Sequence, residues 1–195
     1  MLAEAIAFIV ESEKLKSINR RSNPVGMARY ENSAEHSWSV ALAASVLVPA
    51  VAPHLDQLRV IKMLLIHDIV EIDAGDTFCY SDQTGKAERE QEAAERLFGL
   101  LPAETAQLFH DLWREFEDKE TEESKFANAI DRLLPLIQNS KNGGGSWAEF
   151  NVVYDQVYQR NLEIKNASPE LWDYTKKLIH SAHEAGILPK DRKNP

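Results

Sequence analysis

The stretch RVIKMLLIHDIVEIDAGD, residues 59–76, combines the two patterns that decide the predicted fold. Its first half is apolar at helical spacing, so it predicts a buried helix that ends near the pair His67 and Asp68. Its second half crowds four carboxylates into a short segment: Asp68, Glu71, Asp73 and Asp76. Like charges repel and burial raises carboxylate pKa values, so a bound cation would relieve the crowding. The alternative is a solvated turn around Gly75, with His67 and Asp68 as a local hydrogen-bonded pair.

Helical spacing of apolar residues continues along most of the chain, whereas strand-like alternation is scarce. Further helices are expected in AEREQEAAERLFGLL, AETAQLFHDLWREFED, ESKFANAIDRLLPLIQN, WAEFNVVYDQVYQRNLEI and PELWDYTKKLIHSAHEAG. Because helices with apolar stripes must pack on one another, we predict an all-α bundle of about seven or eight helices. We expect a single domain over residues 1–195, with a core at about 1–141, a turn at NGGGSW, and C-terminal helices at about 147–186.

The composition is that of a compact globular protein, with 44% hydrophobic and 27% charged residues among 195. A formal net charge of −9 argues against binding to a nucleic-acid polymer, which needs a surplus of Lys and Arg. Glu4 and Glu11 interrupt the first apolar stretch, which therefore predicts an amphipathic helix and not a signal peptide. No segment is expected to be long enough to span a bilayer. The single Cys79 fits a reducing compartment, so we expect a cytoplasmic protein with no membrane partner.

Two further residues extend the candidate cation site. His36 stands near the start of an amphipathic helix in NSAEHSWSVALAA, and Asp131 falls in the apolar middle of KFANAIDRLLPLI. Aspartate is unfavourable inside a helix, so another group should satisfy Asp131. Together with His67 and Asp68, these residues supply two imidazoles and two carboxylates, a set that suits Mn, Co, Fe, Ni or Zn. The alternatives are a His36 hydrogen-bonded at a helix start and an Asp131 in a salt bridge with Arg132 or a nearby lysine.

Four segments, in this order and spacing, resemble the HD superfamily of metal-dependent phosphohydrolases. They are LKSINR at 15–20, RYENSAEHS at 29–37, HDIVEIDAGD at 67–76 and KFANAIDRL at 125–133. The similarity is closest to the bacterial 5'-deoxynucleotidases and their HD-domain relatives, and it covers most of the chain up to the NGGG turn. It implies an all-α HD-domain helical bundle, one divalent metal, a homodimer, and hydrolysis of a (deoxy)nucleoside 5'-monophosphate to nucleoside and phosphate.

The resemblance also implies roles for individual residues. By position, the residues that would hold the metal are His36, His67, Asp68 and Asp131. Glu71 matches the catalytic glutamate, which orients or deprotonates the attacking water. The residues that would contact the substrate are Arg20, Asp76, Thr77 and Asp68. The chemistry is coherent, because a phosphomonoester needs positive charge at its non-bridging oxygens and a positioned nucleophile, which a metal and an arginine help to supply. Without the resemblance, Arg20 is better explained as a surface arginine beside Arg21.

Two departures from these relatives concern the substrate. Where the deoxynucleotidases carry a tryptophan after the arginine, this chain has Arg21, which puts a preference for 2'-deoxyribose in doubt. Relatives also tend to have proline shortly after the Gly-Asp pair, whereas this chain reads GDTFCYSD at residues 75–82. We expect this loop to have a different shape, with Phe78 or Tyr80 as an aromatic ring that stacks on a base.

Other functions remain open. An HD hydrolase of another phosphorylated nucleotide, either a pyrophosphate or a cyclic nucleotide, is disfavoured because Ile72 follows Glu71 and because only His110 lies between the HD pair and Asp131. A non-catalytic metal- or nucleotide-binding module is the alternative from another class of protein. Metal-dependent turnover, compared with a Glu71→Ala variant that still binds metal, would distinguish these hypotheses.

Two features near the C-terminus have competing interpretations. His180 and His183 are spaced for a second metal site, but a solvent-facing helix is the better explanation. The aromatic residues between Trp147 and Tyr158 are explained equally well by self-association and by packing inside the monomer.

Overall fold

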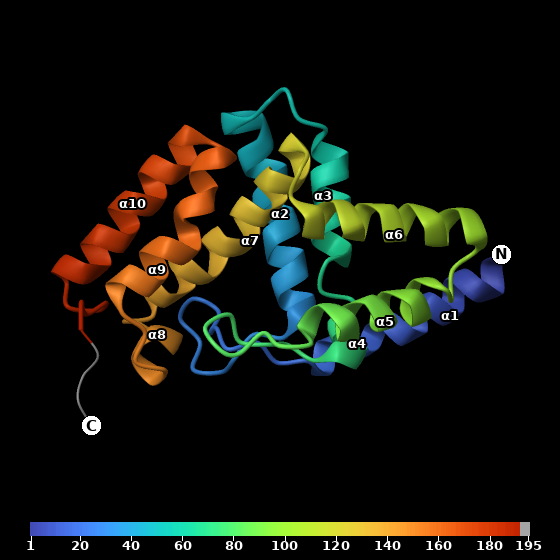
Figure 1. The fold of residues 1–195 in the computed structure, drawn as a ribbon, viewed down its shortest axis with the longest axis horizontal. Helices are drawn as coiled ribbons and strands as arrows, with labels where there is room; N and C mark the ends of the chain where they lie inside the picture. Colours follow the sequence, from blue (N-terminus) through green and yellow to red (C-terminus); the bar gives the residue numbers. More distant parts are fainter. Residues whose placement is uncertain (192–195) are drawn as a thin grey trace.

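A computed structural model describes residues 1–191 (Figure 1). Within this range the chain is helical and has no β-strand, only an isolated bridge between Asn19 and Asn32. The longer α-helices are α1 Leu2–Ser12, α2 Ser33–Val51, α3 Gln57–Ile66, α5 Lys86–Phe98, α6 Ala103–Asp118, α7 Glu122–Lys141, α9 Tyr154–Asn161 and α10 Pro169–Glu184. Short helices are α4 Glu71–Ala74 and α8 Ser146–Glu149, with 3-10 turns η1 Glu13–Ser17 and η2 Leu162–Asn166. The prediction of an all-α bundle of about seven or eight helices is confirmed.

Helix α7 is the centre of the packing. It contacts α2, α3 and α6, and it also contacts η2, α9 and α10, so it joins the two parts of the bundle that Figure 1 shows on either side of it. Phe126 and Ile130 of α7 are buried together with Met63 and Leu64 of α3 and Phe98 of α5. The apolar stripes of these helices therefore form one continuous core.

Helix α2 is both long and apolar. Residues Ser33–Val51 have a mean hydropathy of 1.2, enough for a membrane span by length and composition alone, so the expectation that no segment is long enough is wrong. In the fold, α2 packs against α3 and α7 and buries Val40, Ala44 and Val48. Its hydropathy therefore reflects one face in the core and an apolar outer stripe.

Local sequence signals set the helix ends that carry the candidate site. Asn32 and Glu35 form a capping box at the start of α2, in which each side chain accepts a hydrogen bond from the other residue's backbone N–H. This fixes the first turn, where His36 lies. At the other candidate segment, α4 ends at Gly75, whose φ of +74° suits glycine and turns the chain toward Asp76.

The C-terminal helices pack back onto α7, and burial inside the monomer accounts for most of their aromatic and apolar residues. Trp147 is 3% exposed and Val157 is fully buried. Phe150 is 38% exposed, and its ring lies 4.5 Å from that of Phe78, centroid to centroid. The packing therefore favours the second of the two interpretations, while the division into a core and a C-terminal part stays a prediction.

Candidate active site

Four predicted ligand residues from three helices meet at one point. His36 lies in the first turn of α2, His67 and Asp68 directly follow α3, and Asp131 lies in the middle of α7. Asp131 Oδ1 is 2.8 Å from His36 Nε2 and 3.6 Å from His67 Nε2, and Asp68 Oδ1 is 3.0 Å from His67 Nε2. Ligand atoms of His36, His67 and Asp68 all lie within 4.8 Å of one another. The helices thus bring together every residue predicted to hold the metal.

The hydrogen bonding of His67 indicates what the cluster can hold. Its Nδ1–H donates to the carbonyl of Leu64 at 2.9 Å, so Nε2 carries the lone pair when the ring is neutral. This Nε2 is buried, has no hydrogen-bond partner among residues 1–191, and faces the carboxylates of Asp68 and Asp131. Burial alone lowers the pKa of His67, but the two carboxylates outweigh it and raise the pKa to about 9. The pocket therefore favours positive charge, and its nitrogen and oxygen donors fit a divalent transition metal.

A carboxylate that the sequence analysis did not single out lies behind His36. Glu31 is 1% exposed and accepts hydrogen bonds from Ser22 Oγ at 2.8 Å, Gln138 Nε2 at 2.6 Å and His36 Nδ1 at 3.1 Å. With Nδ1–H donated to Glu31, the Nε2 lone pair of His36 is directed at the metal cluster. A carboxylate behind a ligating imidazole is a recurrent feature of protein metal sites, because it fixes the ring and its tautomer.

The contact between Glu31 and the site depends on a short pairing of two loops. Arg20 N–H donates to the Glu31 carbonyl at 3.0 Å, Glu31 N–H to the Ser22 carbonyl at 2.8 Å, and Ser33 N–H to the Ile18 carbonyl at 2.9 Å. These bonds hold residues 18–22 against residues 31–33. Helical periodicity carries no signal for such a pairing, so Glu31 was not predicted.

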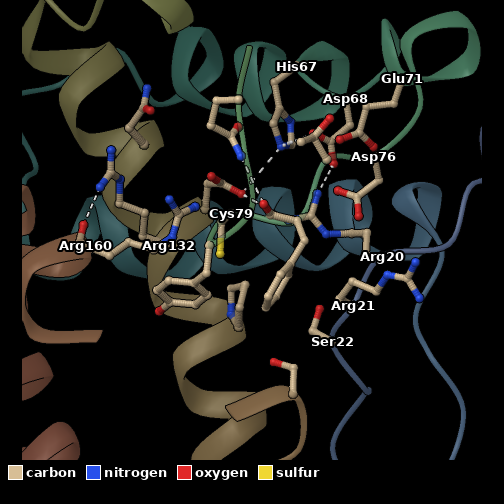
Figure 2. A pocket seen from close by; sticks show the side chains of 18 of the residues that line it. Arg20, Arg21, Ser22, His67, Asp68, Glu71, Asp76, Cys79, Arg132 and Arg160 are labelled. Carbon is tan, nitrogen blue, oxygen red and sulfur yellow. Dashed lines mark hydrogen bonds and ion pairs between the residues drawn. The ribbon is translucent and has the colours of Figure 1, made fainter. Parts of the chain in front are cut away.

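Arg20 is partly buried against the cluster and is not a surface arginine. Its Nη1 donates to Asp68 Oδ2 at 2.6 Å (Figure 2), and its Nε lies 3.4 Å from Glu31 Oε1. Its Nη2 is 3.9 Å from Asp131 Oδ1. The side chain of Arg20 is 16% exposed, so its guanidinium group faces both the carboxylates and the adjoining cavity.

Glu71 occupies a buried position next to this cluster. It is 5% exposed, and its Oε2 accepts a hydrogen bond from Ser33 Oγ at 2.6 Å. Burial, together with the charges of Asp68 and Asp76, raises the pKa of Glu71 well above its ordinary value, although Arg20 opposes the shift. The sequence argument that crowded, buried carboxylates have raised pKa values holds for Glu71 and for Asp76.

The cluster opens into a cavity of about 300 Å³. Arg20, Asp68 and Glu71 line it, as do Asp76 and Thr77, the other residues predicted to contact substrate. The two aromatic residues predicted for base stacking, Phe78 and Tyr80, also line it, and so does Arg21. Figure 2 shows Arg20, Arg21 and Asp76 at the cavity, with His67, Asp68 and Glu71 along one edge.

The structure also decides between alternatives for the remaining residues. Arg132 does not pair with the neighbouring Asp131, because its Nη2 donates to Glu163 at 2.8 Å. His180 is exposed and 3.2 Å from Glu184, while His183 Nδ1 donates to the Leu188 carbonyl at 2.8 Å. The two histidines therefore have separate partners, as expected for a helix without a second metal site.

Comparison with known proteins identifies close relatives of this fold. A predicted metal-dependent phosphohydrolase from Magnetospirillum magnetotacticum is 44% identical, with a TM-score of 0.92 over 96% of this chain and 95% of that one. The 5'-deoxynucleotidase HDDC2 of Bos taurus is 30% identical over 114 residues, which are 57% of this chain. The match spans only 54% of that relative's length.

A more distant structure has the same fold. The HD phosphohydrolase DatZ of cyanophage S-2L, bound to dA and one catalytic Zn²⁺, is 19% identical, with a TM-score of 0.54 over 88% of this chain and 96% of that one. The sequence profile of the HD domain family (HD_3) matches residues 12–172, which include all four residues of the candidate metal centre. This chain is therefore a member of the HD domain family.

Proposed function

We propose that this protein is a metal-dependent phosphomonoesterase that hydrolyses (deoxy)nucleoside 5'-monophosphates to nucleoside and phosphate. The observation that carries the proposal is the convergence of the His/Asp cluster, Arg20 and Glu71 on one cavity. A volume of about 300 Å³ suits a ligand of mononucleotide size. The relationship to a 5'-deoxynucleotidase and to a metal-dependent phosphohydrolase supports the same activity.

We assign the metal to His36, His67, Asp68 and Asp131. A divalent ion held there supplies a Lewis acid that polarises phosphate oxygens and lowers the pKa of water. The residue types are compatible with Mn, Co, Fe, Ni or Zn, and we propose that one such ion is bound.

The protein's own side chains divide the remaining work. Arg20 donates hydrogen bonds to the non-bridging phosphate oxygens, and its contact with Asp68 keeps it beside the cluster. Ser33 donates a hydrogen bond to one oxygen of Glu71, and the other oxygen accepts from a water molecule in the cavity. Glu71 takes a proton from the water as the water oxygen bonds to phosphorus, the P–O5' bond breaks, and Glu71 returns that proton to the departing 5' oxygen. Asp76 and Thr77 contact the sugar.

The test is phosphate release from a panel of ribo- and deoxynucleoside 5'-monophosphates by metal-stripped protein, with Mn, Co or Zn added back. We expect turnover that requires metal and that falls at least about a hundredfold in Glu71→Gln, in line with the loss of a general base. The Glu71→Gln variant should still bind metal. Glu92→Gln changes an exposed glutamate on α5 and is the matched control.

If no nucleotide of the panel released phosphate although one metal was tightly bound, the nucleotidase proposal would be refuted. Turnover of a cyclic or pyrophosphate nucleotide in place of the monophosphates would indicate another HD hydrolase. Full activity of Glu71→Gln would show that Glu71 does not act as the base.

We further propose that the protein acts in the cytoplasm as a homodimer. The single Cys79 is a free thiol, which suits a reducing compartment. Trp38, Leu42 and Val46 form an apolar stripe on the outer face of α2 and are 64%, 49% and 62% exposed. Light scattering of Leu42→Glu should report a smaller mass than for the native chain, whereas Leu108→Glu on α6 should not. A native chain that is monomeric at micromolar concentration would contradict the dimer.

A further inference from the structure

The far end of the cavity is built by a part of the chain that carries none of the residues assigned to the chemistry. Arg160 and Asn161, the last two residues of α9, line the same cavity as the metal cluster. In Figure 2, Arg132 and Arg160 lie on the other side of Cys79 from Arg20. If phosphate occupies the Arg20 end, the rest of a bound nucleotide extends toward α9.

Arg160 offers hydrogen-bond donors that no carboxylate uses. Its guanidinium carbon lies 5.9 Å from the centre of the Tyr80 ring, and the side chain makes no ion pair within residues 1–191. Arg132 is different, because it bonds to Glu163 and to the backbone carbonyl of Arg160. Arg132 therefore anchors the backbone of its neighbour, while the planar donor edge of Arg160 stays free.

Asn161, next to Arg160 in the cavity lining, offers a hydrogen-bond acceptor instead of donors. The residue is 3% exposed, and its Nδ2 donates to the Val157 carbonyl at 2.8 Å, which fixes the orientation of the amide. Its Oδ1 is buried and has no hydrogen-bond partner in the described part of the chain. A buried acceptor without a partner is unfavourable, so a ligand N–H that reached it would be strongly favoured.

These groups together define the ligand chemistry. An arginine fork next to an aromatic ring accepts a flat group with two adjacent acceptors, and the Asn161 oxygen requires a donor on that same group. A second phosphate could accept hydrogen bonds from Arg160. It has no donor for the Asn161 oxygen, because ionised phosphate oxygens are also acceptors. Guanine and hypoxanthine carry O6 and N7 as adjacent acceptors and N1–H as a donor, whereas adenine has an amino group in place of O6.

We propose that Tyr80, Arg160 and Asn161 form a base subsite that selects 6-oxopurines over adenine. The subsite rests on the proposed function, because it assumes a nucleotide with its phosphate at the metal. In the subsite, Tyr80 contacts the face of the base, Arg160 donates to O6 and N7, and Asn161 accepts from N1–H.

The first test compares kcat/KM for dGMP, dIMP and dAMP in the native chain, Arg160→Met, Arg160→Lys and Asn161→Ala. Native protein should prefer dGMP and dIMP to dAMP by roughly tenfold or more, the discrimination that a bidentate arginine–guanine pair provides. Arg160→Met should lose most of this preference with little change for dAMP or for base-free deoxyribose 5-phosphate. Arg160→Lys keeps the charge but loses the fork, so it should lose the preference as well. Asn161→Ala should lower the preference for both 6-oxopurines.

Arg114→Met, which changes an exposed arginine on α6, is the matched control and should behave as native protein. Melting temperatures check that each variant is folded. Equal kcat/KM for dGMP and dAMP in the native chain would overturn the subsite. So would an equal loss on all substrates in Arg160→Met, since that would put Arg160 at the phosphate. A preference for a nucleoside 3',5'-bisphosphate that depends on Arg160 would instead identify an anion site.

A second measurement separates this inference from the proposed function. Calorimetric titration of the manganese-loaded chain with free deoxyguanosine, deoxyinosine and deoxyadenosine needs no phosphate and no turnover. Tighter binding of the two 6-oxopurine nucleosides, lost in Arg160→Met, would support the subsite even if no nucleotide were hydrolysed. Equal binding of all three would refute it even if the enzyme released phosphate from every nucleotide.

Discussion

Replacing Glu31 by glutamine should lower the metal affinity, although Glu31 is not itself one of the residues assigned to the metal. Every group within reach of the Glu31 carboxylate is a donor: Ser22 Oγ at 2.8 Å, Gln138 Nε2 at 2.6 Å, His36 Nδ1 at 3.1 Å and Arg20 Nε at 3.4 Å. Glutamine turns one acceptor oxygen into an NH₂ group, which must then face a donor. The buried site cannot relieve this mismatch with solvent, since Glu31 is 1% exposed.

The size of the effect follows from these contacts. Loss of one hydrogen bond to a charged group costs about 1.5–3 kcal/mol, so the metal-free Glu31→Gln variant should be less stable to urea by about that amount. Without the anion behind it, the His36 ring is held less firmly in the tautomer that presents Nε2. Metal affinity should fall roughly 10- to 100-fold, as for other residues that support a ligating imidazole.

The assay is competition for Zn²⁺ or Mn²⁺ against a chromophoric chelator, with the visible spectrum of the Co²⁺ form as a second readout. The spectrum reports the ligand geometry and would not change if Glu31 only contributed to folding. Glu92→Gln on α5 serves as the control at an exposed glutamate. A folded Glu31→Gln variant with native metal affinity and a native Co²⁺ spectrum would refute the argument.

Two further substitutions test other contacts. Ser33→Ala removes the donor to Glu71 Oε2, so kcat should fall about tenfold at unchanged metal affinity, and an unaltered kcat would remove Ser33 from the mechanism. Burial raises the pKa of Glu115, but hydrogen bonds from Arg59 and Thr121 outweigh it and lower the pKa. A lowered folded-state pKa adds stability that is present above the ordinary pKa and is lost as the pH falls through the folded value. Glu115→Gln should therefore cost up to about 1 kcal/mol in urea unfolding at pH 7, and this cost should shrink as the pH is lowered below the ordinary glutamate pKa; a cost that does not change with pH would contradict this reasoning.

Asp131 and His67, which the sequence itself singled out, share one property: each departs from the apolar pattern of its helix. Asp131 in the middle of α7 and His67 at the end of α3 stand out because periodicity marks those positions as core. A polar residue at a core position needs a partner, and their partners are each other and His36. The family resemblance then supplied the roles, which stay predictions until the variants are measured.

The parts that were not predicted depend on contacts between segments without regular structure or far apart in sequence. Glu31 reaches His36 only because residues 18–22 pair with residues 31–33. Arg160 reaches the cavity only because α9 packs against α7. The sequence shows a glutamate in a loop and an arginine on a polar helix, and both are ordinary surface residues by composition. Such contacts follow from tertiary packing, which neither periodicity nor residue spacing encodes.

Helix α7 links the two ends of the cavity through consecutive residues. Asp131 faces the metal cluster, and Arg132 anchors the backbone of Arg160 at the opposite end. Successive residues of a helix point about 100° apart, so one turn of α7 can place Asp131 at the metal cluster and Arg132 at Arg160. The backbone hydrogen bonds of the helix keep these two side-chain directions fixed. The distance between the proposed phosphate end and the proposed base end is then set by α7 and not by a loop. A rigid separation favours ligands of one length, which is what a mononucleotide requires and a longer phosphate chain would not match.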